Sequence, residues 1–159
     1  MSIFLHDTRD KVGKHQNVDD YLIGHGHKII RSKLYVGDIT LLINQRVCID
    51  LKRNISELCM DVCQDHKRFR DELQRAYDAE IKLIILVENY DKITNLSELP
   101  NWVNPRADKS PLAPNGERLF KICRAMSGSY GTDFLFCHPS SAGMHVETIL
   151  LHGRYTGIY

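Results

Sequence analysis

The sequence predicts an α/β fold in which a mixed central sheet is flanked by helices. Three observations lead to this prediction. Short apolar and β-branched runs recur along the chain, as expected of buried strands. A long amphipathic segment follows two of these runs, and further strand-like and helix-like segments alternate after it. At 159 residues the chain is about one domain long, and we expect a single domain over 1–159.

The N-terminal part is predicted to form a strand, a short helix and a three-stranded meander. The opening strand ends at 7–10, and the apolar runs 39–43 and 47–51 are two strands of the meander. The polar tripeptide 44–46 between these runs is typical of a turn, so we expect them to form a β-hairpin.

Residues 54 to about 77 are predicted to form one long helix. Asn54, followed three residues later by Glu57, is typical of a capping box at its start. This capping role is the structural interpretation of Glu57, and metal ligation is the alternative. The apolar residues that recur at helical spacing define the face packed on the sheet, namely Ile55, Leu58, Cys59, Val62, Phe69, Leu73 and Ala76.

A long loop is predicted after the next core strand, at 84–88. Four prolines punctuate the segment 91–115, which has no clear period. A loop of this length in a compact domain is usually functional or disordered. Trp102, Arg106 and Lys109 would give an aromatic and basic contact to DNA. The alternative is a surface insertion that the tryptophan anchors.

The remaining chain is predicted to form a helix, a strand and a last helix. The first helix covers 117–126 and ends near Gly128, and the strand covers 134–137. His138-Pro139 is expected to terminate this strand. Ser140 is the expected N-cap of the last helix.

Two aspartates and a lysine give the strongest indication of function. Asp38 lies at the start of one hairpin strand and Asp50 near the end of the other. Side chains alternate along a strand, so Asp50 and Lys52 project to one face and Leu51 to the opposite face. Carboxylates suit Mg²⁺ or Mn²⁺, which polarises a phosphodiester and activates water while the lysine offsets developing charge. The alternative is a salt bridge on a solvated strand.

Five short motifs follow one another over residues 3–90. They are Asp-Thr-Arg-Asp at 7–10, Val-Gly-Asp at 36–38, Asp-Leu-Lys at 50–52, Arg-Phe-Arg-Asp-Glu at 68–72 and Ile-Ile-Leu-Val-Glu at 84–88. In this order they resemble the XPF-type nuclease domain of the PD-(D/E)XK superfamily, found in endonucleases that cut branched DNA. The first four correspond to its Asp-x-Arg-Glu, Val-Gly-Asp, Glu-Arg-Lys and Gly-Arg-Phe-x-x-Gln motifs, and the fifth to its next core strand.

The chain also departs from the family motifs. Aspartate replaces glutamate in the first and third motifs, which keeps the carboxylate but shortens its reach by one methylene. Leu51 replaces an arginine, and Ser56 stands where members often carry an aspartate. In the fourth motif, Lys67 replaces the glycine and Glu72 the glutamine. These changes leave the carboxylates and the lysine in place, and we expect an active site.

The resemblance implies a restriction-endonuclease-like core and a Mg²⁺- or Mn²⁺-dependent endodeoxyribonuclease. Its expected substrate is branched DNA, such as a flap, a fork or a Holliday junction. The roles that it implies are a metal site at Asp38, Asp50 and Leu51, a water-orienting or charge-stabilising Lys52, auxiliary acids at Asp7 and Asp10, and substrate-binding cations at Arg68 and Arg9. Two alternatives remain for single residues: Asp7 caps the following turn, and Arg68 lies on a solvated charged face.

A catalytically silent DNA-binding or scaffolding subunit with the same fold is the alternative function. An unrelated α/β protein with accidental motif matches is a third. We expect no helix-hairpin-helix module in the chain, so DNA affinity would come from its own surface, a homodimer or another subunit. The expected location is the cytoplasm of a bacterium, or of a host cell for a phage protein, and the nucleus for a eukaryotic source.

Composition sets looser limits. The net charge of +1 gives no basic excess that would itself indicate nucleic-acid binding. No apolar stretch approaches the ~20 residues of a membrane span, and we see no secretory signal. The five cysteines lack zinc-type spacing and are interpreted as reduced thiols. None of the eight histidines is assigned as a ligand, and His25-Gly26-His27 is interpreted as a solvated turn.

Overall fold

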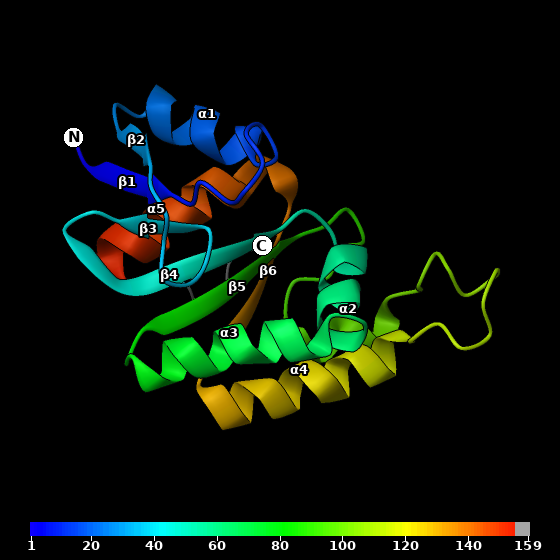
Figure 1. The fold of residues 1–159 in the computed structure, drawn as a ribbon. Coiled ribbons are helices and arrows are strands. Elements are labelled where there is room, and N and C mark those ends of the chain that lie inside the picture. Colours follow the sequence, from blue (N-terminus) through cyan, green and yellow to red (C-terminus); the bar gives the residue numbers. More distant parts are fainter. Residues whose placement is uncertain (155–159) are drawn as a thin grey trace.

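A mixed six-stranded sheet in the order β2-β1-β3-β4-β5-β6 forms the centre of this computed structural model, which describes residues 1–154 (Figure 1). The strands are β1 (Ile3–His6), β2 (Lys28–Arg31), β3 (Ile39–Leu41), β4 (Asn44–Lys52), β5 (Lys82–Glu88) and β6 (Asp133–Cys137). β1, β3 and β4 pair antiparallel, whereas β2, β5 and β6 each join the sheet in parallel. The predicted mixed sheet is therefore confirmed.

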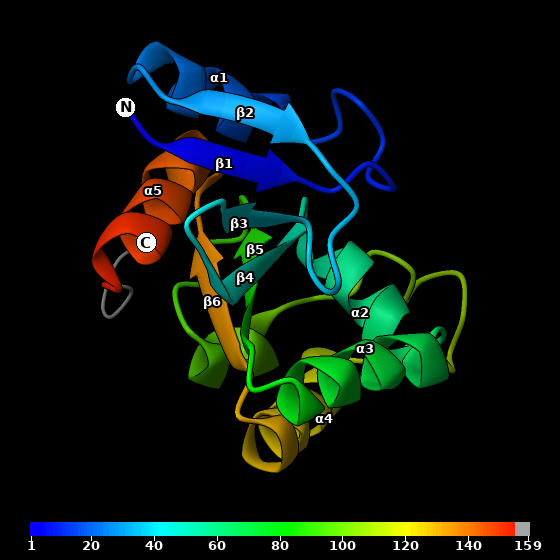
Figure 2. The ribbon, with the colours of Figure 1, turned by 60° about the vertical axis from the view of Figure 1, so that its left-hand side comes forward.

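Helices cover both faces of this sheet (Figure 2). α1 (Gln16–Gly24) and α5 (Ala142–His152) pack together on one face. The opposite face carries α2 (Ile55–Cys63), α3 (His66–Asp78) and α4 (Gly116–Tyr130). Two short 3-10 helices, η1 (Leu96–Asn101) and η2 (Pro139–Ser141), precede α4 and α5. Among the helices of the described chain, none is long and apolar enough to cross a membrane.

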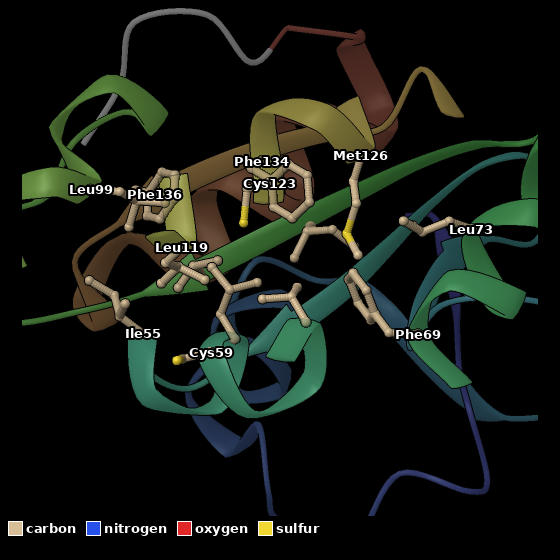
Figure 3. Packing of buried hydrophobic residues seen from close by; sticks show 14 of the residues in the cluster. Ile55, Cys59, Phe69, Leu73, Leu99, Leu119, Cys123, Met126, Phe134 and Phe136 are labelled. Carbon is tan, nitrogen blue, oxygen red and sulfur yellow. The ribbon is translucent and has the colours of Figure 1, made fainter. Parts of the chain in front are cut away.

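Strand alternation divides the apolar core into two clusters. Leu83, Ile85 and Val87 of β5 face α2, α3 and α4, whereas Ile84 and Leu86 face α1 and α5. A strand that is buried on both faces has apolar residues at successive positions, and this explains the apolar sequence of the 84–88 motif. Figure 3 shows Phe69, Leu73, Met126 and Phe134 within the first of these clusters.

The same alternation fixes the directions of side chains along β4. Cys48 packs in the cluster under α2 and α3, whereas Ile49 and Leu51 pack in the opposite cluster. Asp50 and Lys52 follow Cys48 at intervals of two residues, so they face α2 and α3. The predicted separation of Asp50 and Lys52 from Leu51 is therefore present in the fold.

The meander and its hairpin differ in detail from the prediction. β1 itself is the third strand of the antiparallel meander, and β2 lies outside it at the sheet edge. The predicted turn at 44–46 is wrong, because Leu41 pairs with Asn44 and the connection is the apolar dipeptide Leu42-Ile43. Ile43 is 87% exposed. The first residues of β4 extend into solvent, where polar side chains are compatible with a strand.

The predicted helix over 54–77 is two helices. α2 ends at Cys63, and α3 begins at His66. The break escapes periodicity analysis because Val62 and Phe69, on either side of it, are seven residues apart and stay on one face. All seven predicted apolar positions are buried. Asn54 caps α2 by accepting from the Glu57 N–H at 2.8 Å, as predicted.

The C-terminal elements are present with shifted ends. α4 continues through Gly128 to Tyr130, and Gly131 ends it with a left-handed φ of 64°. The predicted cap at Ser140 is wrong, because the His138 ring accepts from the Ser140 N–H and α5 starts only at Ala142.

The loop 91–115 contains η1 and a buried anchor. Trp102 is 5% exposed and belongs to the apolar cluster beneath α4. The segment after it projects from the body of the molecule (Figure 1) and carries the exposed residues Arg106 and Lys109. This placement favours the interpretation of Trp102 as an anchor over direct contact with DNA.

Two glycines of α4 give a matched test of this packing. A Cβ at Gly116 would lie 2.1 Å from the Leu99 carbonyl oxygen and 2.8 Å from that of Trp102. Because main-chain atoms cannot move aside cheaply, we expect Gly116→Ala to lower the free energy of unfolding by about 1–3 kcal/mol or more. Gly128→Ala meets nothing within 4 Å and should raise it by about 0.5–1 kcal/mol. Urea denaturation measures the unfolding free energy of both variants. Equal changes in the two variants would contradict the close packing at Gly116.

His145 of α5 provides a pH test of the other helical layer. It is 4% exposed, and its Nε2 has no hydrogen-bond partner among the described residues. Burial lowers the pKa of His145. A base with a lowered pKa contributes its full stability above its unfolded pKa of about 6.5 and loses it as the pH falls. We expect the unfolding free energy of His145→Leu, relative to wild type, to increase between pH 7.5 and 5. A pH-independent difference would contradict this.

Candidate active site

A polar cleft of about 460 Å³ lies between the end of β4, the loop after β1, and helices α2 and α3. Its lining is almost entirely ionisable and consists of Asp7, Arg9, Asp10, Lys14, Gly37, Asp38, Asp50, Lys52, Glu57, Asp61, Arg68, Glu72 and Arg75. Every ionisable residue predicted for the site lines this cleft. The fold therefore brings together side chains that lie far apart in the chain, from Asp7 to Arg75.

Main-chain contacts with β4 and β1 hold Asp38 in the cleft. Its N–H donates to the Ile49 carbonyl at 2.8 Å, and its own carbonyl accepts from the Asp7 N–H at 2.7 Å. Its carboxylate accepts from the Leu51 N–H at 2.7 Å. Gly37 precedes it with a φ of 74°, and a Cβ there would lie 3.1 Å from the Ile49 carbonyl oxygen. Glycine thus permits the close approach to β4 that positions Asp38.

Asp38 and Asp50 are difficult to ionise together. Burial, followed by the charge of Asp50, raises the pKa of Asp38 well above its usual range. Burial also raises the pKa of Asp50 to about 6, against the attraction of Lys52. Asp50 Oδ1 makes no hydrogen bond of good geometry within the described chain, although Lys52 Nζ lies 2.6 Å away. A divalent cation bound by oxygen ligands would compensate both carboxylates, so these residues fit Mg²⁺ or Mn²⁺.

Lys52 is held as a buried cation. Its Nζ lies 2.6 Å from Asp50 Oδ1 and 2.6 Å from Asp61 Oδ2. Burial alone would lower the pKa of Lys52, but the two carboxylates raise it above the usual lysine range. The ammonium also lies 5.5 Å from the centre of the Phe69 ring. Lys52 is therefore protonated in this arrangement and can stabilise negative charge, but it cannot accept a proton.

Leu51 differs from the other predicted site residues. Its side chain is 1% exposed and packs in the apolar cluster on the α1 and α5 face. Its N–H is already bonded to Asp38. Only its carbonyl oxygen could therefore be a metal ligand.

Asp7 and Arg9 form a local pair at the mouth of the cleft. Asp7 accepts from the Arg9 N–H at 2.7 Å and from the Leu34 N–H at 3.3 Å. The Arg9 guanidinium donates to both Asp7 oxygens and to the Leu34 carbonyl. Burial opposes ionisation of Asp7, but its bonds with Arg9 hold its pKa below the usual range. This geometry corresponds to the turn-capping alternative for Asp7.

Asp10 lies among three basic side chains. Its Oδ2 is 2.9 Å from His6 Nε2 and 3.4 Å from His15 Nε2, and its Oδ1 is 3.7 Å from Lys14 Nζ. His6 also contacts Asp19 at 3.0 Å. Burial would lower the pKa of His6, but hydrogen bonds with Asp10 and Asp19 raise it to about 9. By contrast, burial lowers the pKa of His15 to about 4, which leaves its imidazole neutral at pH 7.

Sequence reasoning missed several residues of the cleft. Asp61 follows Glu57 by four residues on α2, and Glu72 follows Arg68 by four residues on α3. The i, i+4 spacing of these charged residues beside the apolar stripe could have identified them, because residues at this spacing share a helix face. Glu72 accepts from the Gly37 N–H at 2.8 Å, so it supports the segment that carries Asp38. Arg68 is 82% exposed, with Nη2 4.0 Å from Asp61.

His15 is another omission. One ring nitrogen of His15, one carboxylate oxygen of Asp10 and one of Asp38 lie within 4.8 Å of one another and could ligate a metal ion. No periodicity or motif in the sequence singles it out. Only the fold brings the start of α1 next to Asp38.

Comparisons with known proteins identify the fold. No protein-family model matches the sequence, and no curated protein matches it. Among solved structures, XPF from Aeropyrum pernix in complex with DNA has a TM-score of 0.68 at 17% identity. A second structure of XPF from Aeropyrum pernix has a TM-score of 0.67 at 18% identity. Each match covers 96% of this chain and 65% of the XPF chain.

This chain therefore has the fold of an XPF nuclease, with an α/β restriction-endonuclease-like core. The predicted fold class is confirmed, and the predicted resemblance to XPF is confirmed at the level of the fold. The comparison covers just under two thirds of each XPF chain, so it describes that part alone.

The Asp50-Lys52-Asp61 arrangement can be tested by charge removal. Asp61 is 14% exposed and contributes one of the two carboxylates around Lys52. We expect Asp61→Asn to lower the free energy of unfolding by about 1–3 kcal/mol, because it weakens a largely buried ion pair. Asp71→Asn is the control, since its pair with Lys67 is exposed on both sides and should contribute nothing measurable. Equal urea midpoints for Asp61→Asn and wild type would contradict this role.

Proposed function

We propose that this protein is a Mg²⁺- or Mn²⁺-dependent endonuclease that hydrolyses phosphodiester bonds in branched DNA. One observation carries the proposal: Asp38, Asp50 and the buried cation Lys52 lie together in a polar cleft on an XPF nuclease fold. One of the two similar XPF structures is a complex with DNA, and this supports DNA as the substrate.

The residues of the cleft have separable roles in this proposal. Asp38, Asp50 and the Leu51 carbonyl would hold the ion. When bound, a divalent cation would polarise the scissile phosphate and lower the pKa of the attacking water. Lys52, kept protonated by its two carboxylate neighbours, would stabilise charge that develops on the phosphate. Asp7 and Asp10 support the acidic cluster from the loop after β1.

Cations at the edge of the cleft would contact the DNA backbone. Arg68 is exposed and lies beside Asp61, where its planar guanidinium can bind a phosphate through two hydrogen bonds. Arg9 is 52% exposed and keeps its pair with Asp7. We further propose that DNA affinity also comes from a homodimer or another subunit. Selection among branched forms would depend on that assembly and on surface shape.

A cleavage assay with matched variants tests the activity. The substrates are labelled linear, flap, forked and four-way-junction DNAs, with Mg²⁺, Mn²⁺ or EDTA. We expect cutting of a branched form with metal, and a loss of about 10²-fold or more in Asp50→Asn, because the carboxylate holds the ion that stabilises the transition state. Asp71→Asn, on an exposed part of α3, is the control. Cleavage retained in both Asp38→Asn and Asp50→Asn would refute the assignment.

A catalytically silent DNA-binding or scaffolding subunit is the second candidate. The observation that favours it is the position of Lys52, whose ammonium contacts Asp50 and Asp61 at 2.6 Å and already offsets their charge without a metal. Calorimetric titration with Mn²⁺ distinguishes the two candidates. A nuclease should show a binding site that depends on Asp38 and Asp50, whereas a silent module should bind branched DNA without one.

A further inference from the structure

His15 is a buried histidine whose two ring nitrogens have no hydrogen-bond partner among the described residues. The residue is 1% exposed, so solvent does not replace those partners. Buried polar groups are almost always hydrogen-bonded, because leaving one unpaired costs about 1–3 kcal/mol. His15 leaves two such atoms unpaired beside Asp10 and Asp38, two residues that line the polar cleft. This is the arrangement expected of a side chain whose partner is a ligand.

The surroundings of His15 supply further ligand atoms. One atom each from Asp10, His15 and Asp38 lie within 4.8 Å of one another. Ligands about 2.0–2.2 Å from a shared metal ion lie up to about 4.4 Å apart, so small side-chain movements would place all three around one ion. The contact between His15 Nε2 and Asp10 Oδ2 is 3.4 Å and does not form a hydrogen bond in this geometry.

Neighbouring residues orient Asp10 within the group of Asp10, His15 and Asp38. The His6 ring bridges two carboxylates: its Nε2 is hydrogen-bonded to Asp10 Oδ2, and its Nδ1 is hydrogen-bonded to Asp19 Oδ1 at 3.0 Å. Buttressing of this kind orients metal-binding carboxylates. His6 is the cation nearest to Asp10, with Nε2 2.9 Å from Asp10 Oδ2. Lys14 lies 3.7 Å from the other oxygen, Oδ1, and makes a shorter contact of 2.9 Å with Glu57. An ion bound through Asp10 Oδ1 would therefore leave the His6 contact intact and displace only the long contact with Lys14.

We propose that Asp10, His15 and Asp38 form a transition-metal site with one nitrogen ligand, which makes the cleft selective for Mn²⁺-type ions over Mg²⁺. The site shares Asp38 with the Asp50 position, so it deepens the proposed function and rests on it for the use made of the metal. Mg²⁺ strongly prefers oxygen ligands, whereas imidazole nitrogen is a good ligand for first-row transition metals. The ring nitrogen of His15 is therefore the ligand that would favour Mn²⁺-type ions over Mg²⁺.

Pulsed electron paramagnetic resonance of bound Mn²⁺ tests the nitrogen ligand directly, without DNA. We expect ¹⁴N modulation from a directly bound imidazole in the wild-type protein, and its loss in His15→Leu. His145→Leu is the matched control, because it removes another buried histidine with an unpaired Nε2, on α5, that does not belong to the group of Asp10, His15 and Asp38. That variant should keep the ¹⁴N signal. Wild-type protein without ¹⁴N modulation, or His15→Leu that retains it, would overturn the proposal.

A competition titration measures the selectivity. We expect the Mn²⁺ affinity of His15→Leu to fall at least about tenfold, while its Mg²⁺ affinity changes little, since Mg²⁺ does not use the nitrogen. An equal loss for both ions would overturn the claim of selectivity. If His15→Leu fails to fold, the wild-type ¹⁴N measurement still decides whether the bound ion has a nitrogen ligand.

The outcome for catalysis is separate. A wild-type protein that binds Mn²⁺ through nitrogen but cuts no DNA would refute the proposed nuclease and retain the metal site. Cleavage of DNA by a wild-type protein without the ¹⁴N signal would refute the proposed metal site and retain the proposed nuclease.

Discussion

The approach of Asp38 to β4 is the constraint on which the candidate site depends. Its N–H, carbonyl and carboxylate bond to Ile49, Asp7 and Leu51 respectively, so one residue joins the ends of β1, β3 and β4. Gly37 makes the approach possible because a side chain there would press against β4. Any change that moves this junction would move Asp38 away from Asp50 and Lys52, which stay together on β4.

Charge compensation is the second organising principle of the cleft. Acidic and basic side chains alternate around it, so that Lys52 lies between two aspartates and Asp10 lies among His6, Lys14 and His15. Such groups are costly to bury singly, but together they offset one another. The two exceptions are Asp38 with Asp50, where like charges meet, and His15 beside the cleft, whose ring nitrogens have no hydrogen-bond partner within the described chain. Both exceptions lie where a cation would be accommodated.

Much of the fold followed from local patterns because those patterns record burial directly. The apolar run 84–88 predicted a central strand, and the stripe from Ile55 to Ala76 predicted the packed helical face. The same patterns could not locate the break at Gln64-Asp65, since the stripe continues in phase across it. They also misplaced the hairpin turn, because Leu42 and Ile43 are apolar but exposed. Periodicity reports which face is buried and does not report where the main chain interrupts an element.

The sequence by itself determined the identity and order of the motif residues, and alternation along a strand was enough to put Asp50 and Lys52 on one face. It could not determine which distant groups meet them. Asp61 and Glu72 line the cleft from α2 and α3, and His15 lies beside Asp10 and Asp38 at the start of α1. No local spacing relates these three residues to Asp38. Only the tertiary structure brought them together, because proximity across a sheet depends on strand order and helix docking, which are set by the packing of the whole core.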